Sequence, residues 1–174
     1  MYVAVCSGPE DMIKVGLSLD PIARWSAFHA RWYEAFDLEH SLLIETETRR
    51  DAQLLETGLH RALIDHNCPP PLTIRGQFGG RTEWYRGAYK SALEFVQSAA
   101  SQGYVIHSPA RPWFVKAMQT RADCFVSIID HGIRSVINGE LNVTQKRALR
   151  DLIDAHVAFD EHIVDRLPSD LSHL

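Results

Sequence analysis

Residues suited to phosphate chemistry occur at two places in the first part of the chain. Gly16 ends a short apolar run, and Arg24 follows eight positions later in a stretch with helical periodicity. Glu56 lies further along, in a second helical stretch. A carboxylate on a helix can hold a hard divalent cation, and a guanidinium offers a planar fork to a phosphate. These residue types suit phosphodiester hydrolysis, which needs an activated water and neutralisation of charge on the phosphoryl oxygens.

The elements that carry these residues follow from turn signals and periodicity. Apolar runs at 2–6 and 12–16 flank a dense turn signal and predict a β-hairpin. Asp20 is suited to N-cap a helix that has Pro21 in its first turn. The remaining predicted elements are a strand over 37–45, a helix from 48 to the prolines at 69–71, a loop over 76–80, a strand at 82–85 and a helix over 90–101. This order predicts an α/β fold with a small, mostly antiparallel sheet flanked by helices.

The last third of the chain has a different sequence pattern, with apolar residues at helical spacing. Two prolines at 109 and 112 predict a boundary, which gives one domain over 1–108 and a C-terminal α-helical hairpin over 109–174. Its first helix is expected from about 113 to 137. Asn142 and Gln145 have the spacing of a capping box and begin the second helix. The hairpin is expected to serve in packing, homodimerisation or docking of a protein partner.

Four segments in order resemble the GIY-YIG nuclease superfamily, in particular its phage-type branch, over roughly residues 1–100. They are Tyr2, the string from Lys14 through Gly16 to Arg24, the helix at 52–60 with Glu56 and His60, and the Glu-Trp-Tyr segment at 83–85. Lys14 stands where that family has its second tyrosine. The resemblance implies a nuclease fold in which Gly16 is a structural motif residue and Glu56 is the ligand of one metal ion, Mg²⁺ or Mn²⁺.

The resemblance and the residue types together imply roles at the site. Tyr2 is expected to act as the base or to position the attacking water, if nearby cations lower its pKa. Lys14 and Arg24 are expected to bind phosphate and stabilise charge. His29, five positions after Arg24, is expected to shuttle protons. The predicted catalytic set is therefore Tyr2, Lys14, Arg24 and His29.

Contacts with DNA are expected from Lys14, Arg24, His60 and Trp84. Trp84 is suited to a core position, and beside a groove it would stack on an unpaired base. The net charge of −4 argues against a broadly basic, nonspecific binder, so DNA contacts must come from a local cluster of cations. No apolar stretch has the roughly 18 residues that a membrane-spanning helix requires. Three widely spaced cysteines indicate a reducing compartment, so we expect a cytoplasmic protein without a membrane partner.

Two classes of function remain open on the sequence. The first is a metal-dependent DNA endonuclease that hydrolyses phosphodiester bonds, favoured by the joint presence of Tyr2, Arg24 and Glu56. The second is a catalytically degenerate module that keeps the same fold to bind DNA or protein. Lys14 in place of a tyrosine and the acidic charge balance favour the second class. The endonuclease is the main expectation.

Overall fold

The computed structural model describes residues 1–74, 82–169 and 171. The chain forms two compact units, Met1–Pro112 and Trp113–Leu174, which divide slightly after the boundary expected at residue 108. The predicted loop over 76–80 lies outside the described residues. Within the described part of the chain, no helix has the length and apolar character needed to cross a bilayer.

The first unit is built on a five-stranded sheet. Its strands are β1 (Tyr2–Cys6), β2 (Met12–Gly16), β3 (Phe36–Glu45), β4 (Trp84–Arg86) and β5 (Val105–His107). Their order in the sheet is β4-β2-β1-β3-β5, and each neighbouring pair is antiparallel. The predicted fold class, an antiparallel sheet with flanking helices followed by C-terminal helices, is confirmed. The short strand β5 was not predicted.

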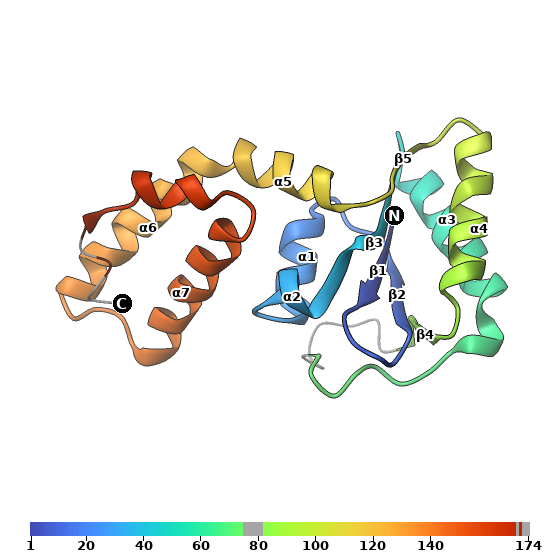
Figure 1. The fold of residues 1–174 in the computed structure, drawn as a ribbon, viewed down its shortest axis with the longest axis horizontal. Coiled ribbons are helices and arrows are strands. Elements are labelled where there is room, and N and C mark those ends of the chain that lie inside the picture. Colours follow the sequence, from blue (N-terminus) through green and yellow to red (C-terminus); the bar gives the residue numbers. More distant parts are fainter. Residues whose placement is uncertain (75–81, 170, 172–174) are drawn as a thin grey trace. The chain divides into compact units, whose positions relative to one another are not determined.

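Helices cover both faces of the sheet (Figure 1). The short helices α1 (Pro21–Phe28) and α2 (Trp32–Ala35) lie on one side, and α3 (Arg49–Ala62) and α4 (Tyr89–Ser101) lie on the other. A 3₁₀ turn, η1 (Ile64–His66), follows α3. The first four helices therefore sandwich the sheet.

Strand alternation divides the core into two parts. Because successive side chains point to opposite faces of a strand, Tyr2 and Lys14 share a face with Trp84, the register partner of Lys14. This face carries an aromatic cluster in which Trp25 contacts Tyr2, Trp32 and Phe36. On the other face, aliphatic side chains of the strands pack against those of α3 and α4. The strands contribute Val3, Ile13, Val15, Leu42 and Ile44, and the helices contribute Leu59, Ala92 and Val96.

Local capping fixes where the site helices begin. The Asp20 side chain accepts a hydrogen bond from the Ala23 amide at the start of α1, as the sequence predicted. The Thr48 hydroxyl accepts one from the Asp51 amide at the start of α3. These caps satisfy amide groups that have no partner within the helix. They therefore fix the first turns of α1 and α3, the helices that carry Arg24 and Glu56.

The second unit is helical. It contains most of α5 (Arg111–Thr120), then α6 (Ala122–Ile137), α7 (Val143–Val157) and the 3₁₀ helix η2 (Glu161–Arg166). The prediction of a single helix from 113 to 137 is wrong, because the helix is interrupted at Arg121, between α5 and α6. There the amide of Arg121 donates to the Met118 carbonyl, a tighter bond than the α-helical one. The predicted capping box of Asn142 and Gln145 is confirmed.

His156 on α7 makes the stability of the second unit depend on pH. Its ring is buried and stacks on Phe125 with 3.6 Å between centroids, and its Nδ1 hydrogen-bonds to the Leu152 carbonyl at 3.0 Å. Burial lowers the pKa of His156 below its ordinary 6.5; the hydrogen bond to Leu152 opposes this effect, and the charge of Arg121 adds a smaller lowering. The stability that the neutral ring contributes is therefore fully present above pH 6.5 and is lost as pH falls through the folded-state pKa.

Denaturant unfolding of the full chain between pH 8 and pH 5 tests this prediction. We expect the unfolding free energy of the second unit to fall more steeply on acidification in the native chain than in His156→Gln, which cannot titrate. His131→Gln, which removes an exposed histidine of α6, should behave as the native chain does. Identical pH profiles for the native chain and His156→Gln would contradict the assignment.

Candidate metal centre

Helix α3 presents two potential metal ligands on one face. Glu56 and His60 are four residues apart, so they lie on adjacent turns. His60 Nε2 is 4.0 Å from Glu56 Oε1. Glu56 is 8% exposed although it is a charged residue, and His60 is half-buried. Burial is the main cause that lowers the pKa of His60, and the nearby Glu56 and Glu83 carboxylates raise it by less. The neutral imidazole that this favours is the form that binds a metal ion.

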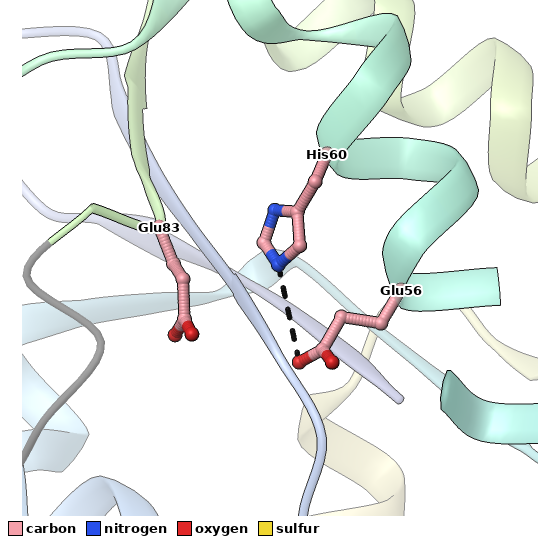
Figure 2. A group of neighbouring side chains, drawn as sticks. All are labelled: Glu56, His60 and Glu83. Atoms are coloured by element: carbon pink, nitrogen blue, oxygen red, sulfur yellow. Dashed lines mark ion pairs between the residues drawn. The ribbon is translucent and has the colours of Figure 1, made fainter. Parts of the chain in front are cut away.

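Glu83, directly before β4, completes a three-residue group. One ligand atom from each of Glu56, His60 and Glu83 lies within 4.8 Å of the other two. Figure 2 shows the two side chains of α3 and the carboxylate of Glu83 reaching into the same space. The Glu83 segment is held in place because the Val15 amide donates to the Glu83 carbonyl at 3.1 Å. The Asn67 side-chain amide also donates to the carbonyls of the two residues that flank Glu83, Thr82 at 2.5 Å and Trp84 at 3.2 Å.

Each member of the group has a second partner that restrains it. The Gln53 amide donates to Glu56 Oε2 at 2.7 Å. The buried Tyr85 hydroxyl hydrogen-bonds with His60 Nδ1 at 2.6 Å, and the two rings stack. The Lys14 ammonium donates to Glu83 Oε2. Such outer partners orient ligand side chains and fix the tautomer of a ligating histidine.

Lys14 is not placed to contact DNA. Its side chain is fully buried, and its ammonium pairs with Glu83 between the rings of Phe28 and Trp84, whose centroids lie 5.6 and 5.7 Å away. Burial lowers the pKa of Lys14, while the hydrogen bond and charge of Glu83 raise it. The predicted phosphate contact of Lys14 is therefore wrong in this structure: the residue restrains a carboxylate of the group instead.

Tyr2 packs against Gly16 across the β1–β2 pair. A Cβ atom at position 16 would lie within 2.6 Å of Tyr2 Cζ, which explains the glycine at the end of β2. Burial raises the pKa of Tyr2 to about 12, because the lowering effect of Arg24 is smaller and the Glu83 and Glu56 carboxylates act in the same direction as burial. The condition for Tyr2 to act as a base is therefore not met, because burial outweighs the effect of the nearby cation on this pKa. Tyr2 is protonated at neutral pH and is suited to donate a hydrogen bond.

Arg24 is connected to the site by its electrostatic interactions with Tyr2 and Lys14. Helices α1 and α3 lie on opposite faces of the sheet, so Arg24 and Glu56 start from opposite sides (Figure 1). Both side chains nevertheless act electrostatically on Tyr2 and on Lys14. The Arg24 guanidinium also lies over the Phe28 ring, 4.8 Å from its centroid. The structure thus brings Tyr2, Lys14, Arg24 and Glu56 to one end of the sheet, with Arg24 next to Tyr2.

Two further predicted site residues, His29 and Trp84, are placed differently from what the sequence suggested. His29 follows α1 and helps to line a separate cavity of about 370 Å³ together with Cys6, Glu10 and Glu34, and its Nδ1 accepts a hydrogen bond from the Arg31 amide. None of the residues that line this cavity belongs to the group, so the proton-shuttle role of His29 stays a prediction. Trp84 is 1% exposed and packs against Phe28, so the base-stacking role is wrong and the core role is confirmed.

The sequence prediction missed Glu83 as a ligand and Gln53 and Tyr85 as partners. Glu83 and Tyr85 belong to the segment that carried part of the resemblance, but nothing local indicates that this segment pairs with β2 beside α3. Gln53 could have been found, since it lies three residues before Glu56 on the same helical face. His60 was named for DNA contact, whereas the structure places it inside the group.

Comparison with known proteins corrects the family. The T5orf172 domain model matches residues 1–100, and no GIY-YIG model matches, so the GIY-YIG assignment is wrong. The four segments that resemble the GIY-YIG superfamily are short and individually unspecific, which explains how the resemblance pointed to a different family. No curated protein and no solved structure matches the chain significantly. Because the family model covers more than half of the 174 residues, this chain belongs to the T5orf172 domain family, whose members are nuclease-like, DNA-binding domains.

Proposed function

We propose that this protein is an endonuclease that hydrolyses phosphodiester bonds in DNA with one divalent metal ion, Mg²⁺ or Mn²⁺. The observation that carries the proposal is the group of Glu56, His60 and Glu83, whose ligand atoms lie within 4.8 Å of one another. The membership in a family of nuclease-like, DNA-binding domains supports a DNA substrate. Arg24 and Tyr2 lie at the same end of the sheet and supply a cation and a hydrogen-bond donor.

The donor set fits a divalent ion. Two carboxylates neutralise the charge of such an ion, and an imidazole adds a nitrogen ligand. Two ligands that are each about 2.1 Å from an ion lie at most about 4.2 Å apart. The 4.8 Å span of the group therefore needs only a small inward movement of flexible side chains. Three protein ligands leave further positions for water and for a phosphate oxygen.

Hydrolysis adds water across the phosphodiester: the oxygen of water bonds to phosphorus, and the leaving oxygen takes a proton as its bond to phosphorus breaks. A bound ion would supply an acidified water and would neutralise charge on the phosphoryl oxygens. Arg24 would present its guanidinium fork to the phosphate. The Tyr2 hydroxyl, protonated at neutral pH and buried beside Arg24, would help to hold that guanidinium in position. Lys14 would hold Glu83 in place.

A DNA-binding module without cleavage activity is the second candidate. One observation favours it: the Lys14 ammonium is buried against Glu83 and so cannot stabilise the charge that develops on a phosphate during cleavage. In this function the same end of the sheet would bind a phosphate through Arg24 without hydrolysing it. The two candidates differ in a single measurable property, which is the breaking of the DNA backbone.

Incubation of the purified full chain with labelled single-stranded, duplex and branched DNA distinguishes the two candidates. We expect cleavage of at least one substrate with Mn²⁺ or Mg²⁺, none with EDTA, and none with Arg24→Ala, a variant that tests the phosphate-binding role. Arg61→Ala, on the exposed side of α3, is the matched control and should cut as the native chain does. Binding of DNA without cleavage under every metal condition would overturn the enzyme and leave the module.

A further inference from the structure

We infer that Glu56, His60 and Glu83 together form a three-ligand site for a divalent transition-metal ion, with His60 as the ligand that selects such an ion over Mg²⁺. The inference rests on the proposed function in taking this group as the metal centre of the reaction. It goes further in choosing the class of ion and in naming the ligand that decides this choice.

The orientation of the α3 side chains is the first support. Gln53 holds Glu56 by Oε2, and the other oxygen, Oε1, is the one that faces His60. Tyr85 holds His60 by Nδ1, and the opposite ring nitrogen, Nε2, is the one that faces Glu56. The restraining hydrogen bonds therefore occupy the outer atoms and leave the inner atoms directed at a common point. A ligating histidine in proteins has this arrangement, with its second nitrogen hydrogen-bonded.

The third ligand is restrained in the same manner. The Lys14 ammonium pairs with Oε2 of Glu83, and the side chain of Lys14 is itself fully buried. A fully buried lysine beside aromatic rings is costly unless it has a specific partner. The ion pair leaves one carboxylate oxygen of Glu83 for another partner. Three side chains from two distant parts of the sequence are thus each held by one hydrogen bond or ion pair, which is more than an accidental acidic cluster requires.

The chemistry of the donors selects the ion. Mg²⁺ prefers oxygen ligands and retains several waters, whereas imidazole nitrogen suits first-row transition ions. A site of two carboxylates and one imidazole therefore favours ions such as Mn²⁺ over Mg²⁺. The side chains of Glu56, His60 and Glu83 are 10%, 24% and 31% exposed. The site is therefore sheltered but not closed to solvent, so water can reach it.

Binding of Mn²⁺ to the full chain without DNA tests the inference. The free-ion signal in electron paramagnetic resonance measures bound Mn²⁺, and added Mg²⁺ measures competition. We expect one Mn²⁺ per chain, held at least about tenfold more tightly than Mg²⁺, and an affinity reduced about 10- to 100-fold in His60→Ala and Glu83→Gln. His131→Ala, an exposed helical histidine, is the matched control and should bind as the native chain does. The loss of His60 should reduce Mn²⁺ affinity more than Mg²⁺ affinity.

Three outcomes overturn the inference: equal affinity of the native chain for the two ions, no measurable Mn²⁺ binding, or unchanged Mn²⁺ affinity in folded His60→Ala. If His60→Ala does not fold, His60→Gln provides the same comparison with a side chain that can still bond to Tyr85. Failure of the proposed function looks different. Selective Mn²⁺ binding without DNA cleavage leaves the site intact and removes the endonuclease, whereas cleavage that is insensitive to His60→Gln keeps the endonuclease and removes the three-ligand site.

Discussion

Glu56→Gln should lower the rate of metal-dependent DNA cleavage by about 10²–10³-fold, the cost of removing one group that stabilises transition-state charge. Glutamine has the shape of glutamate and can still accept a hydrogen bond from Gln53, so the helix should remain folded. It lacks the negative charge that holds a divalent ion. Single-turnover cleavage with saturating protein measures the effect, because it separates the chemical step from DNA binding and product release.

Two controls define the meaning of this result. Glu94→Gln removes a carboxylate from the exposed side of α4 and should cut DNA at the native rate. DNA affinity of Glu56→Gln, measured without metal, should be equal to that of the native chain or slightly higher, since a negative charge near the phosphates is removed. A folded Glu56→Gln protein that cuts at the native rate would exclude Glu56 from the reaction, and with it the proposed metal centre.

Lys14→Met should separate activity from stability. Methionine matches lysine in length and fills the space between Phe28 and Trp84, and it removes the desolvation cost of the fully buried ammonium. Glu83 is 31% exposed, so water can solvate its carboxylate when the ion pair is lost. We therefore expect an unfolding free energy within about 1–2 kcal/mol of the native value. Cleavage should fall about 10- to 100-fold, because Glu83 is no longer held in position.

The readouts for Lys14→Met are denaturant unfolding, the cleavage rate and the Mn²⁺ affinity. A positioning role predicts that cleavage and Mn²⁺ affinity fall together while the unfolding midpoint stays nearly constant. Lys90→Met, on the exposed surface of α4, is the matched control and should change none of the three. A stable Lys14→Met protein that binds Mn²⁺ and cuts DNA at native levels would mean that the Lys14–Glu83 pair has no part in the site.

Part of the candidate site could be predicted because its signals are local. Glu56 stood out as a carboxylate on an amphipathic helix, and His60 lies one turn further along the same face. The spacing of Gly16 and Arg24 placed a glycine at the end of a strand and a cation on the next helix. The metal role of Glu56 and the phosphate role of Arg24 remain predictions, as does a role of the C-terminal helices in dimerisation or docking.

The environment of each site residue could not be predicted in this way. Lys14 and Trp84 were expected to contact a phosphate or a nucleobase, and Tyr2 to activate or position a water, yet all three are nearly or fully inaccessible to solvent. Their burial results from the packing of α1 and α2 on one face of the sheet, which the alternation of β1 and β2 does not specify by itself. The pKa of Tyr2 shows the same effect, because burial decides its direction against the nearby cation.

The sequence by itself determined the elements whose signals lie within a few residues. Examples are the N-cap at Asp20, the capping box at Asn142, the hairpin of β1 and β2, and the antiparallel α/β class. Tertiary structure decided which elements meet. The pairing of Lys14 with Glu83 joins residues 69 positions apart, and the three-residue strands β4 and β5 depend on neighbouring strands for their hydrogen bonds. Capping and periodicity act over one or two turns of chain, whereas a metal centre depends on long-range register, which a single sequence does not display.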